Sequence, residues 1–110
     1  MLPASLNDFA ARVNTNPVIQ KMLKDWDRNI LISVNDTGKQ YTISVKARTV
    51  SVIPGDAGAD IVISGGEEVL TGIFCGRLNP VREYSRGNVN FRGSAKDEMK
   101  VDAVIQMVWG

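Results

Sequence analysis

The side chains that most often carry out catalysis are scarce in this chain of 110 residues. It contains no histidine and a single cysteine, Cys75. Histidine is the most common general base and zinc ligand, so its absence argues against acid–base catalysis and against a zinc site. Cys75 stands late in a predicted helix, away from the helix N-terminus that would activate a thiol. We therefore expect Cys75 to pack rather than react, and we expect no enzyme activity, no metal site and no cofactor.

Two short motifs imitate ion-binding loops without completing them. Residues 25–29 place oxygen ligands as the start of a calcium loop does, but Ile30 stands where that loop requires glycine. The glycine pair at 65–66 precedes a predicted helix, as in a phosphate-binding nest. The two glutamates at 67–68 would repel a phosphate there. Neither ion is therefore expected, and helix capping explains the second motif better.

Four arginines lie close together in the sequence, around a short predicted helix. They are Arg77, Arg82, Arg86 and Arg92, and the second and third share one helical face. Such a group can bind an anionic headgroup, a coenzyme A phosphate or a lipid surface, or it can form an ordinary solvated edge. The net charge of +1 shows no excess of positive charge, so we expect no nucleic acid partner.

The periodicity of apolar residues predicts an α+β fold with five strands. Helical spacing covers residues 4–27, in two pieces that restart at Asn16-Pro17. The predicted strands cover residues 30–35, 41–46, 49–53, 59–63 and 89–92. Short helices are predicted over 64–76 and 80–86, and a longer one follows Ser94. Because the connections between strands are short, we expect consecutive strands to pair mostly antiparallel, with the helices on one face of the sheet.

The helix predicted at 64–76 carries its own start and stop signals. Ser64 and Glu67 have the spacing of a capping box, and Gly76 can take the left-handed conformation that ends a helix. A second helix start follows at Asn79-Pro80. The apolar stripe of the first helix consists of Val69, Leu70, Ile73 and Phe74. We expect this helix to lie across the sheet as a lid.

The C-terminal helix carries more apolar surface than a helix on a filled core requires. One apolar stripe consists of Val101, Val104, Ile105 and Val108, and a second, expected beside it, consists of Met99, Ala103 and Met107. Methionine adapts to changing neighbours, so the second stripe favours a site for a hydrophobic ligand. Ordinary core packing is the alternative explanation.

The order of these elements resembles the sterol-carrier-protein type 2 family of lipid-transfer domains. The resemblance runs through most of the chain, over Phe9 with Asn16-Pro17 and over residues 30–34, 42–45, 50–52, 59–65, 70–80 and 87–93. It implies a single domain over residues 1–110 whose sheet and helices enclose an apolar tunnel. It also implies non-catalytic binding of sterols, fatty acids, acyl-coenzyme A or other lipids. The peroxisomal tripeptide of eukaryotic members is absent, and no secretory signal is seen, so a cytoplasmic location is expected.

The leading hypothesis is therefore binding, with transfer, of a hydrophobic ligand in an internal tunnel, with transient membrane contact. The expected lining residues are Leu70, Ile73, Phe74, Leu78, Val89, Phe91, Met99, Ala103 and Met107. The expected headgroup or membrane rim consists of Arg77, Arg82 and Arg86. Opening would require the C-terminal helix or the helix at 64–76 to swing.

Two alternatives remain open from the sequence. The surplus apolar face of the C-terminal helix can dock on a partner protein or on a second copy of the chain as a homodimer. The domain can also be an accessory that presents a hydrophobic substrate to a partner enzyme.

Overall fold

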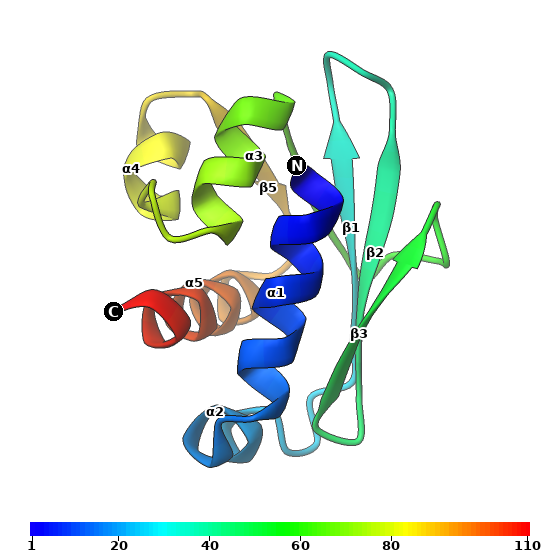
Figure 1. Ribbon diagram of the computed structural model, residues 1–110, viewed down its shortest axis with the longest axis vertical. Helices are drawn as coiled ribbons and strands as arrows, with labels where there is room; N and C mark the ends of the chain where they lie inside the picture. Colours follow the sequence, from blue (N-terminus) through cyan, green and yellow to red (C-terminus); the bar gives the residue numbers. More distant parts are fainter.

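A five-stranded mixed sheet forms one layer of the protein, and five helices form the other (Figure 1). The computed structural model describes residues 1–110. In chain order the elements are α1 (Leu2–Asn14), α2 (Pro17–Met22), β1 (Arg28–Val34), β2 (Gln40–Lys46), β3 (Thr49–Pro54), β4 (Ile61–Gly65), α3 (Glu67–Phe74), α4 (Pro80–Ser85), β5 (Val89–Arg92) and α5 (Ala95–Trp109). The predicted α+β class is confirmed, with element boundaries that differ by a few residues.

The strand order is β3-β2-β1-β4-β5, so β4 does not pair with the strand that precedes it. Three of the pairings are antiparallel, but β4 pairs parallel with β1, with Ile32 opposite Ile63. The expectation of antiparallel pairing between consecutive strands is therefore wrong for β3 and β4. The segment between them does not turn back as a hairpin. It crosses the sheet to the other side of β1.

This crossing loop is held against the face of the sheet opposite the helices. Thr42 Oγ1 donates a hydrogen bond to the carbonyl oxygen of Gly55 at 2.8 Å and accepts one from the N–H of Ala57 at 3.1 Å. Asn29 Nδ2 donates to the carbonyl oxygen of Gly58 at 3.0 Å. Thr42 and its cross-strand neighbour Leu31 are buried as a result, although both point away from the helices.

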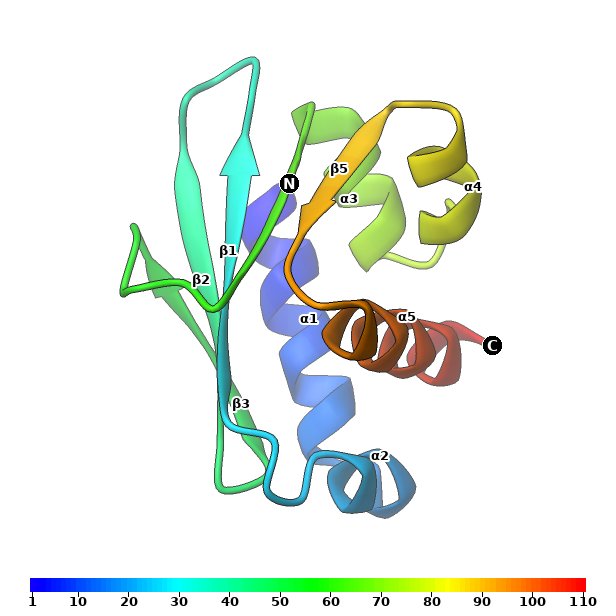
Figure 2. The same cartoon turned by 180° about the vertical axis from the view of Figure 1, so that it is seen from behind.

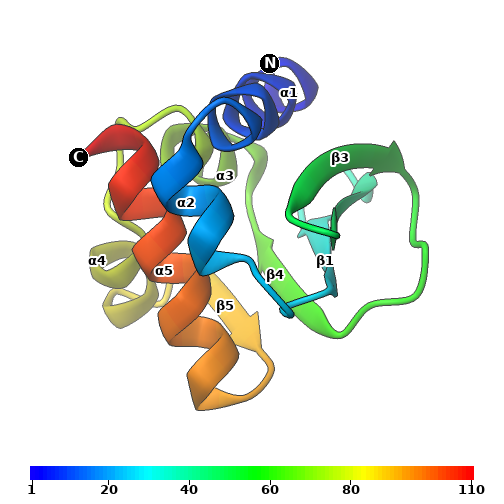
Figure 3. The same ribbon diagram turned by 90° about the horizontal axis from the view of Figure 1, so that it is seen from below.

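The helices cover the other face, as Figures 2 and 3 show from behind and from below. Alternate residues of the strands point toward them and form one core with α1, α3 and α5. Ile32 and Ile43 are among its most buried sheet residues, and Leu6 and Phe74 come from the helices. Helix α1 lies across β3 and beside α3, so the core is closed from that side.

Several predicted helix ends are confirmed. The side chains of Asn16 and Asn79 cap α2 and α4, each with a proline at the first helical position. The hydroxyl of Ser94 accepts from the N–H of Asp97 at the start of α5. Gly76 follows α3 with φ of 83°, the left-handed conformation expected at that position.

The capping box predicted for α3 is wrong. Ser64 lies in β4, and Gly66 is the N-cap residue, which has no side chain to offer. The N–H of Glu67 donates instead to Asp36 Oδ1 at 3.1 Å. Asp36 belongs to the turn after β1, and the parallel pairing of β1 with β4 brings that turn to the start of α3.

The first turn of α5 is locked to the segment that leads into β1. Asp97 accepts hydrogen bonds from Trp26 Nε1 at 2.8 Å and from Arg28 Nε at 3.3 Å, and Lys100 Nζ donates to the carbonyl oxygen of Met22 at 2.7 Å. Burial alone would raise the pKa of Asp97, but the hydrogen bonds from Trp26, Arg28 and Ser94, with the charge of Arg28, lower it overall. This lock fixes the rotation of α5 about its own axis.

The last turn of α5 rests on the end of α3. A Cβ atom at Gly76 would lie 2.6 Å from the Trp109 ring, so only glycine permits this contact. The guanidinium carbon of Arg12, from α1, lies 4.5 Å from the centroid of the same ring. Helix α5 is therefore held at both ends.

Replacement of Asp36 tests the origin of the α3 cap. Asp36→Ala removes the only side-chain acceptor at the start of α3 and is expected to lower the free energy of unfolding by about 1 kcal/mol. Ser64→Ala is the matched control, because the sequence motif predicts Ser64 as the cap of α3, whereas in the structure Ser64 lies in β4 and does not cap the helix. Urea denaturation of both variants measures the difference. A larger loss from Ser64→Ala than from Asp36→Ala would contradict this account.

Candidate functional site

Two small apolar cavities lie between the sheet and the helices. The first has a volume of about 60 Å³ and is bounded by side chains of β4, α3, α4, β5 and α5. The second has a volume of about 20 Å³, and every residue around it is hydrophobic. Its wall includes Phe9 and Val13 of α1, Ile43 of β2 and Trp26.

Four side chains border both cavities and form the partition between them. They are Ile63 of β4, Phe74 of α3, and Val101 and Ile105 of α5. Phe74 is 1% exposed, and its ring meets that of Phe9 edge to face with centroids 5.2 Å apart. Ligand pockets typically measure about 300–1,000 Å³, so both cavities are far smaller than a bound lipid needs. The two cavities are not joined into a continuous tunnel, because these four side chains lie between them.

Four of the predicted lining residues come together around the first cavity. Ile73 and Phe74 reach it from α3, and Val89 and Phe91 reach it from β5. These side chains are apolar and largely buried. Strand β4 pairs with β5 and leads directly into α3, which brings β5 and α3 close together.

The other predicted lining residues lie elsewhere. Leu70 is fully buried in the core, and Leu78 packs beside Gly72 next to a surface groove. Ala103 borders neither cavity. Met99 is 72% exposed and Met107 is 41% exposed.

The two methionines lie outside because of the helical repeat. With Val101 buried, Met99, Ala103 and Met107 fall roughly 160–240° away around the helix, on its opposite side. The two stripes of α5 are therefore opposite faces rather than neighbours, and the expected interior stripe is a surface stripe.

Glu98 and Asp102 take the place in the first cavity that was expected for the methionines. They share a helical face with Val101 and Ile105, at the spacing i, i+3, i+4 and i+7. That spacing is visible in the sequence, but the prediction considered only the apolar residues of the stripe and so missed the two carboxylates beside them. Val81 and Tyr84 of α4 also border this cavity and were missed because α4 appeared only as a carrier of arginines.

The charge around the first cavity is negative. Neither Glu98 nor Asp102 has a side-chain hydrogen bond or an ion pair with the protein, and no lysine or arginine borders either cavity. Burial raises the pKa of Asp102 above its ordinary value of 3.8, and the nearby charge of Glu98 raises it further.

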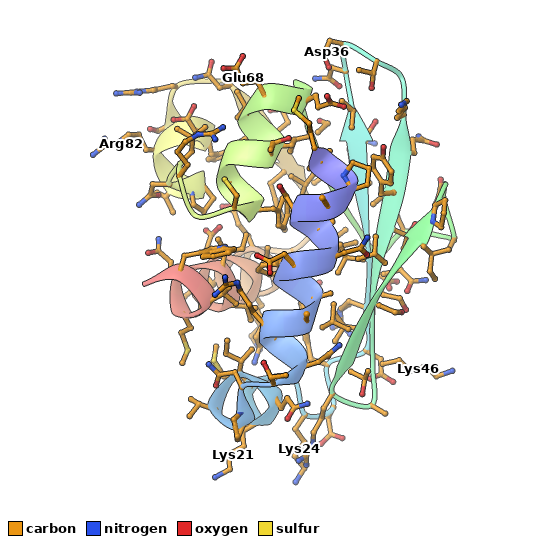
Figure 4. All side chains as sticks on the ribbon, viewed as in Figure 1. Lys21, Lys24, Asp36, Lys46, Glu68 and Arg82 are labelled. Carbon is orange, nitrogen blue, oxygen red and sulfur yellow. The ribbon has the colours of Figure 1, made fainter.

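The predicted arginine rim surrounds α4 on the outside of the molecule. Arg77, Arg82 and Arg86 are exposed, and Figure 4 shows Arg82 pointing away from the body of the protein. The only acidic residue of α4, Glu83, is 5% exposed and accepts a hydrogen bond from Asn88 Nδ2 at 3.0 Å. Val81 and Tyr84 are partly exposed on the side of α4 that faces the first cavity, so the surface around α4 carries both positive charge and apolar side chains.

The structure contains no group of three or more histidine, cysteine, aspartate or glutamate side chains placed to hold a metal ion. Cys75 is half-buried, with Sγ 3.6 Å from the carbonyl oxygen of Gly72. None of the helices has the length and the hydrophobicity that a membrane span requires.

Comparison with known sequences gives one clear match. The sequence model of the SCP-2 sterol transfer family matches residues 6–106. No curated protein sequence matches the chain significantly.

Solved structures with the same fold are numerous and distant in sequence. A structure described as "UbiJ-SCP2 Ubiquinone synthesis protein" superposes with a TM-score of 0.78 at 12% identity, over 97% of this chain and 94% of the other. A crystal structure of sterol carrier protein 2 gives 0.69 at 15% identity, over 96% and 93% of the two chains. Palmitated SCP2L2 from Aedes aegypti gives 0.63 at 20% identity, over 92% and 90%. At these identities the similarity shows the fold alone.

Asp102→Asn tests the electrostatic state of the first cavity. Because the pKa of Asp102 is raised by folding, its ionisation opposes folding once the pH exceeds 3.8. The variant is expected to unfold at a higher temperature than the native protein at pH 7, and the difference should shrink as the pH approaches 3. Thermal unfolding at pH 3, 5 and 7 measures this. If the variant were less stable than the native protein by the same amount at pH 7 and at pH 3, the raised pKa of Asp102 would be contradicted.

Proposed function

The chain belongs to the SCP-2 sterol transfer family, and we propose that it binds and transfers a hydrophobic molecule between its sheet and its helices. The observation that carries the proposal is the pair of cavities with largely apolar walls, separated only by the side chains of four residues. Rotation of Phe74 and Ile105 would join them into one channel. Each CH₂ group of a ligand moved from water into that channel would contribute about 0.8 kcal/mol to binding.

Helix α4 is the best candidate for the part that opens. Helix α5 is held at both ends, and α3 is capped by Asp36 and packed beside α1. Helix α4 has six residues, packs mainly against β5, and lies between two turns that contain Gly76 and Gly87 in the left-handed conformation. Its Val81 and Tyr84 border the first cavity, so an outward movement of α4 would uncover that cavity directly.

The same helix is suited to contact a membrane. Exposed Val81 and Tyr84 can enter the apolar boundary of a bilayer, while Arg77, Arg82 and Arg86 approach anionic headgroups. The arginines border neither cavity, which favours a role toward the membrane surface over a role toward the ligand's own headgroup.

An accessory role is the second candidate. The exposed stripe of Met99 and Met107 on α5 is an adaptable apolar surface on which a partner enzyme, or a second copy of the chain, can dock. The structural similarity to a ubiquinone synthesis protein is consistent with a domain that presents a hydrophobic substrate to a partner.

A matched pair of substitutions on α5 tests binding in the cavities. Val101→Phe fills the space at the partition, at a cost of about 1–3 kcal/mol in stability. It is expected to weaken binding of the neutral dye N-phenyl-1-naphthylamine at least tenfold. Met99→Phe, on the outer side of the same helix, should leave dye binding unchanged.

Two outcomes of this experiment would count against the proposal. One is the absence of saturable dye binding to the native protein, with no lipid in solvent extracts analysed by mass spectrometry. The other is equal weakening by both substitutions. Light scattering of Met99→Phe and of the native protein shows in parallel whether the methionine stripe joins two copies.

Neutralisation of the α4 arginines tests the membrane contact. The double variant Arg77→Gln and Arg82→Gln is expected to bind anionic vesicles about thirty-fold more weakly, because each surface cation contributes about 1 kcal/mol. Lys21→Gln with Lys24→Gln is the control, since Figure 4 shows these lysines at the opposite end of the molecule. Vesicle sedimentation at low salt measures both. Equal losses in the two double variants would contradict a contact through α4.

A further inference from the structure

Resting on the proposed function, we propose that Glu98 and Asp102 make the first cavity selective for hydrophobic molecules whose polar end donates a hydrogen bond and carries no negative charge. Long-chain alcohols and phenols are the class that fits. Fatty acids and phosphate-bearing lipids are the class that is rejected.

The two carboxylates occupy the wall of the cavity itself. They lie one helical turn apart on α5, on the face that also carries Val101 and Ile105. Phe91 of β5 and Tyr84 of α4 border the same cavity. An aliphatic chain in the apolar part would therefore bring its polar end close to these two side chains.

Both carboxylates are free to accept hydrogen bonds from a ligand. Two other acidic side chains with little exposure are used within the protein, since Asp97 accepts from Trp26 and Arg28, and Glu83 accepts from Asn88, whereas Glu98 and Asp102 are half-buried. Glu98 and Asp102 have no such donor. A hydroxyl group placed between them would supply the missing donor, and hydrogen bonds to charged acceptors are stronger than those between neutral groups.

A negatively charged ligand end would find no partner there. The cavity wall contains no lysine or arginine, and the arginines around α4 are exposed and border neither cavity. A carboxylate or phosphate would lose part of its hydration on entering the cavity and would meet two like charges, both of which oppose binding.

The position of Asp102 supports a role toward a ligand. Desolvation and the charge of Glu98 raise the pKa of Asp102, so its ionised form is unfavourable in the folded protein. A charged group beside a cavity whose ionised form is disfavoured by folding, and whose side chain makes no hydrogen bond within the protein, is typical of a functional site.

A series of ligands with one chain length tests this selectivity. Dodecan-1-ol, dodecylamine and dodecanoate, each below its micelle concentration at pH 8, compete with N-phenyl-1-naphthylamine for the native protein. The alcohol and the amine are expected to bind at least tenfold more tightly than dodecanoate. In the double variant Glu98→Gln and Asp102→Asn, the affinity for dodecanoate should rise at least fivefold, so the difference in affinity between the alcohol and dodecanoate becomes smaller.

The control is a second double variant with the same change in net charge. Asp25→Asn and Glu68→Gln alter two exposed carboxylates outside both cavities, and the selectivity of the native protein should persist in this variant. Thermal unfolding confirms that each variant is folded.

The outcomes separate this inference from the proposed function. If the native protein binds the dye but binds dodecanoate as tightly as dodecan-1-ol, the selectivity is overturned and the proposed binding remains. The same holds if the double variant Glu98→Gln and Asp102→Asn has the same ratio of alcohol to dodecanoate affinity as the native protein. Failure of the dye and of all three ligands to bind overturns the proposed function as well.

Discussion

The hydrogen bond from Trp26 Nε1 to Asp97 Oδ1 determines what surrounds the first cavity. It joins the first turn of α5 to the segment before β1, and Arg28 and Lys100 strengthen the junction from either side. Once this turn is fixed, the helical repeat leaves no freedom further along α5. Val101 and Ile105 must face inward, Glu98 and Asp102 must face the cavity, and Met99 must face solvent.

The features that the sequence predicted correctly depend on neighbouring residues. Asparagine before proline caps a helix, and a glycine ends one, through contacts within a few positions along the chain, so Asn16, Asn79 and Gly76 were assigned correctly. The alternation of apolar residues likewise identified each strand. The structure places Ile73, Phe74, Val89 and Phe91 around the first cavity, and their role in binding a ligand stays a prediction.

The features that were missed depend on residues far apart in the chain. The parallel pairing of β1 with β4 requires a loop that crosses the back of the sheet, and nothing in residues 55–60 alone distinguishes it from a hairpin. The cap of α3 by Asp36 is a consequence of that pairing. The rotation of α5 depends on a contact between residues 26 and 97, so the sequence pattern could show two apolar stripes without showing which one faces the core.

The two tryptophans of the chain lie in different environments and are therefore two distinct intrinsic optical probes. Trp26 is 8% exposed and borders the second cavity, while Trp109 rests on Gly76 at the far end of α5. The emission of the first indole depends on the polarity of the cavity wall and on the charge of Asp97. The emission of the second depends on the seating of α5 against α3. Filling of the interior and displacement of a helix therefore leave separate fluorescence signatures in an unlabelled chain.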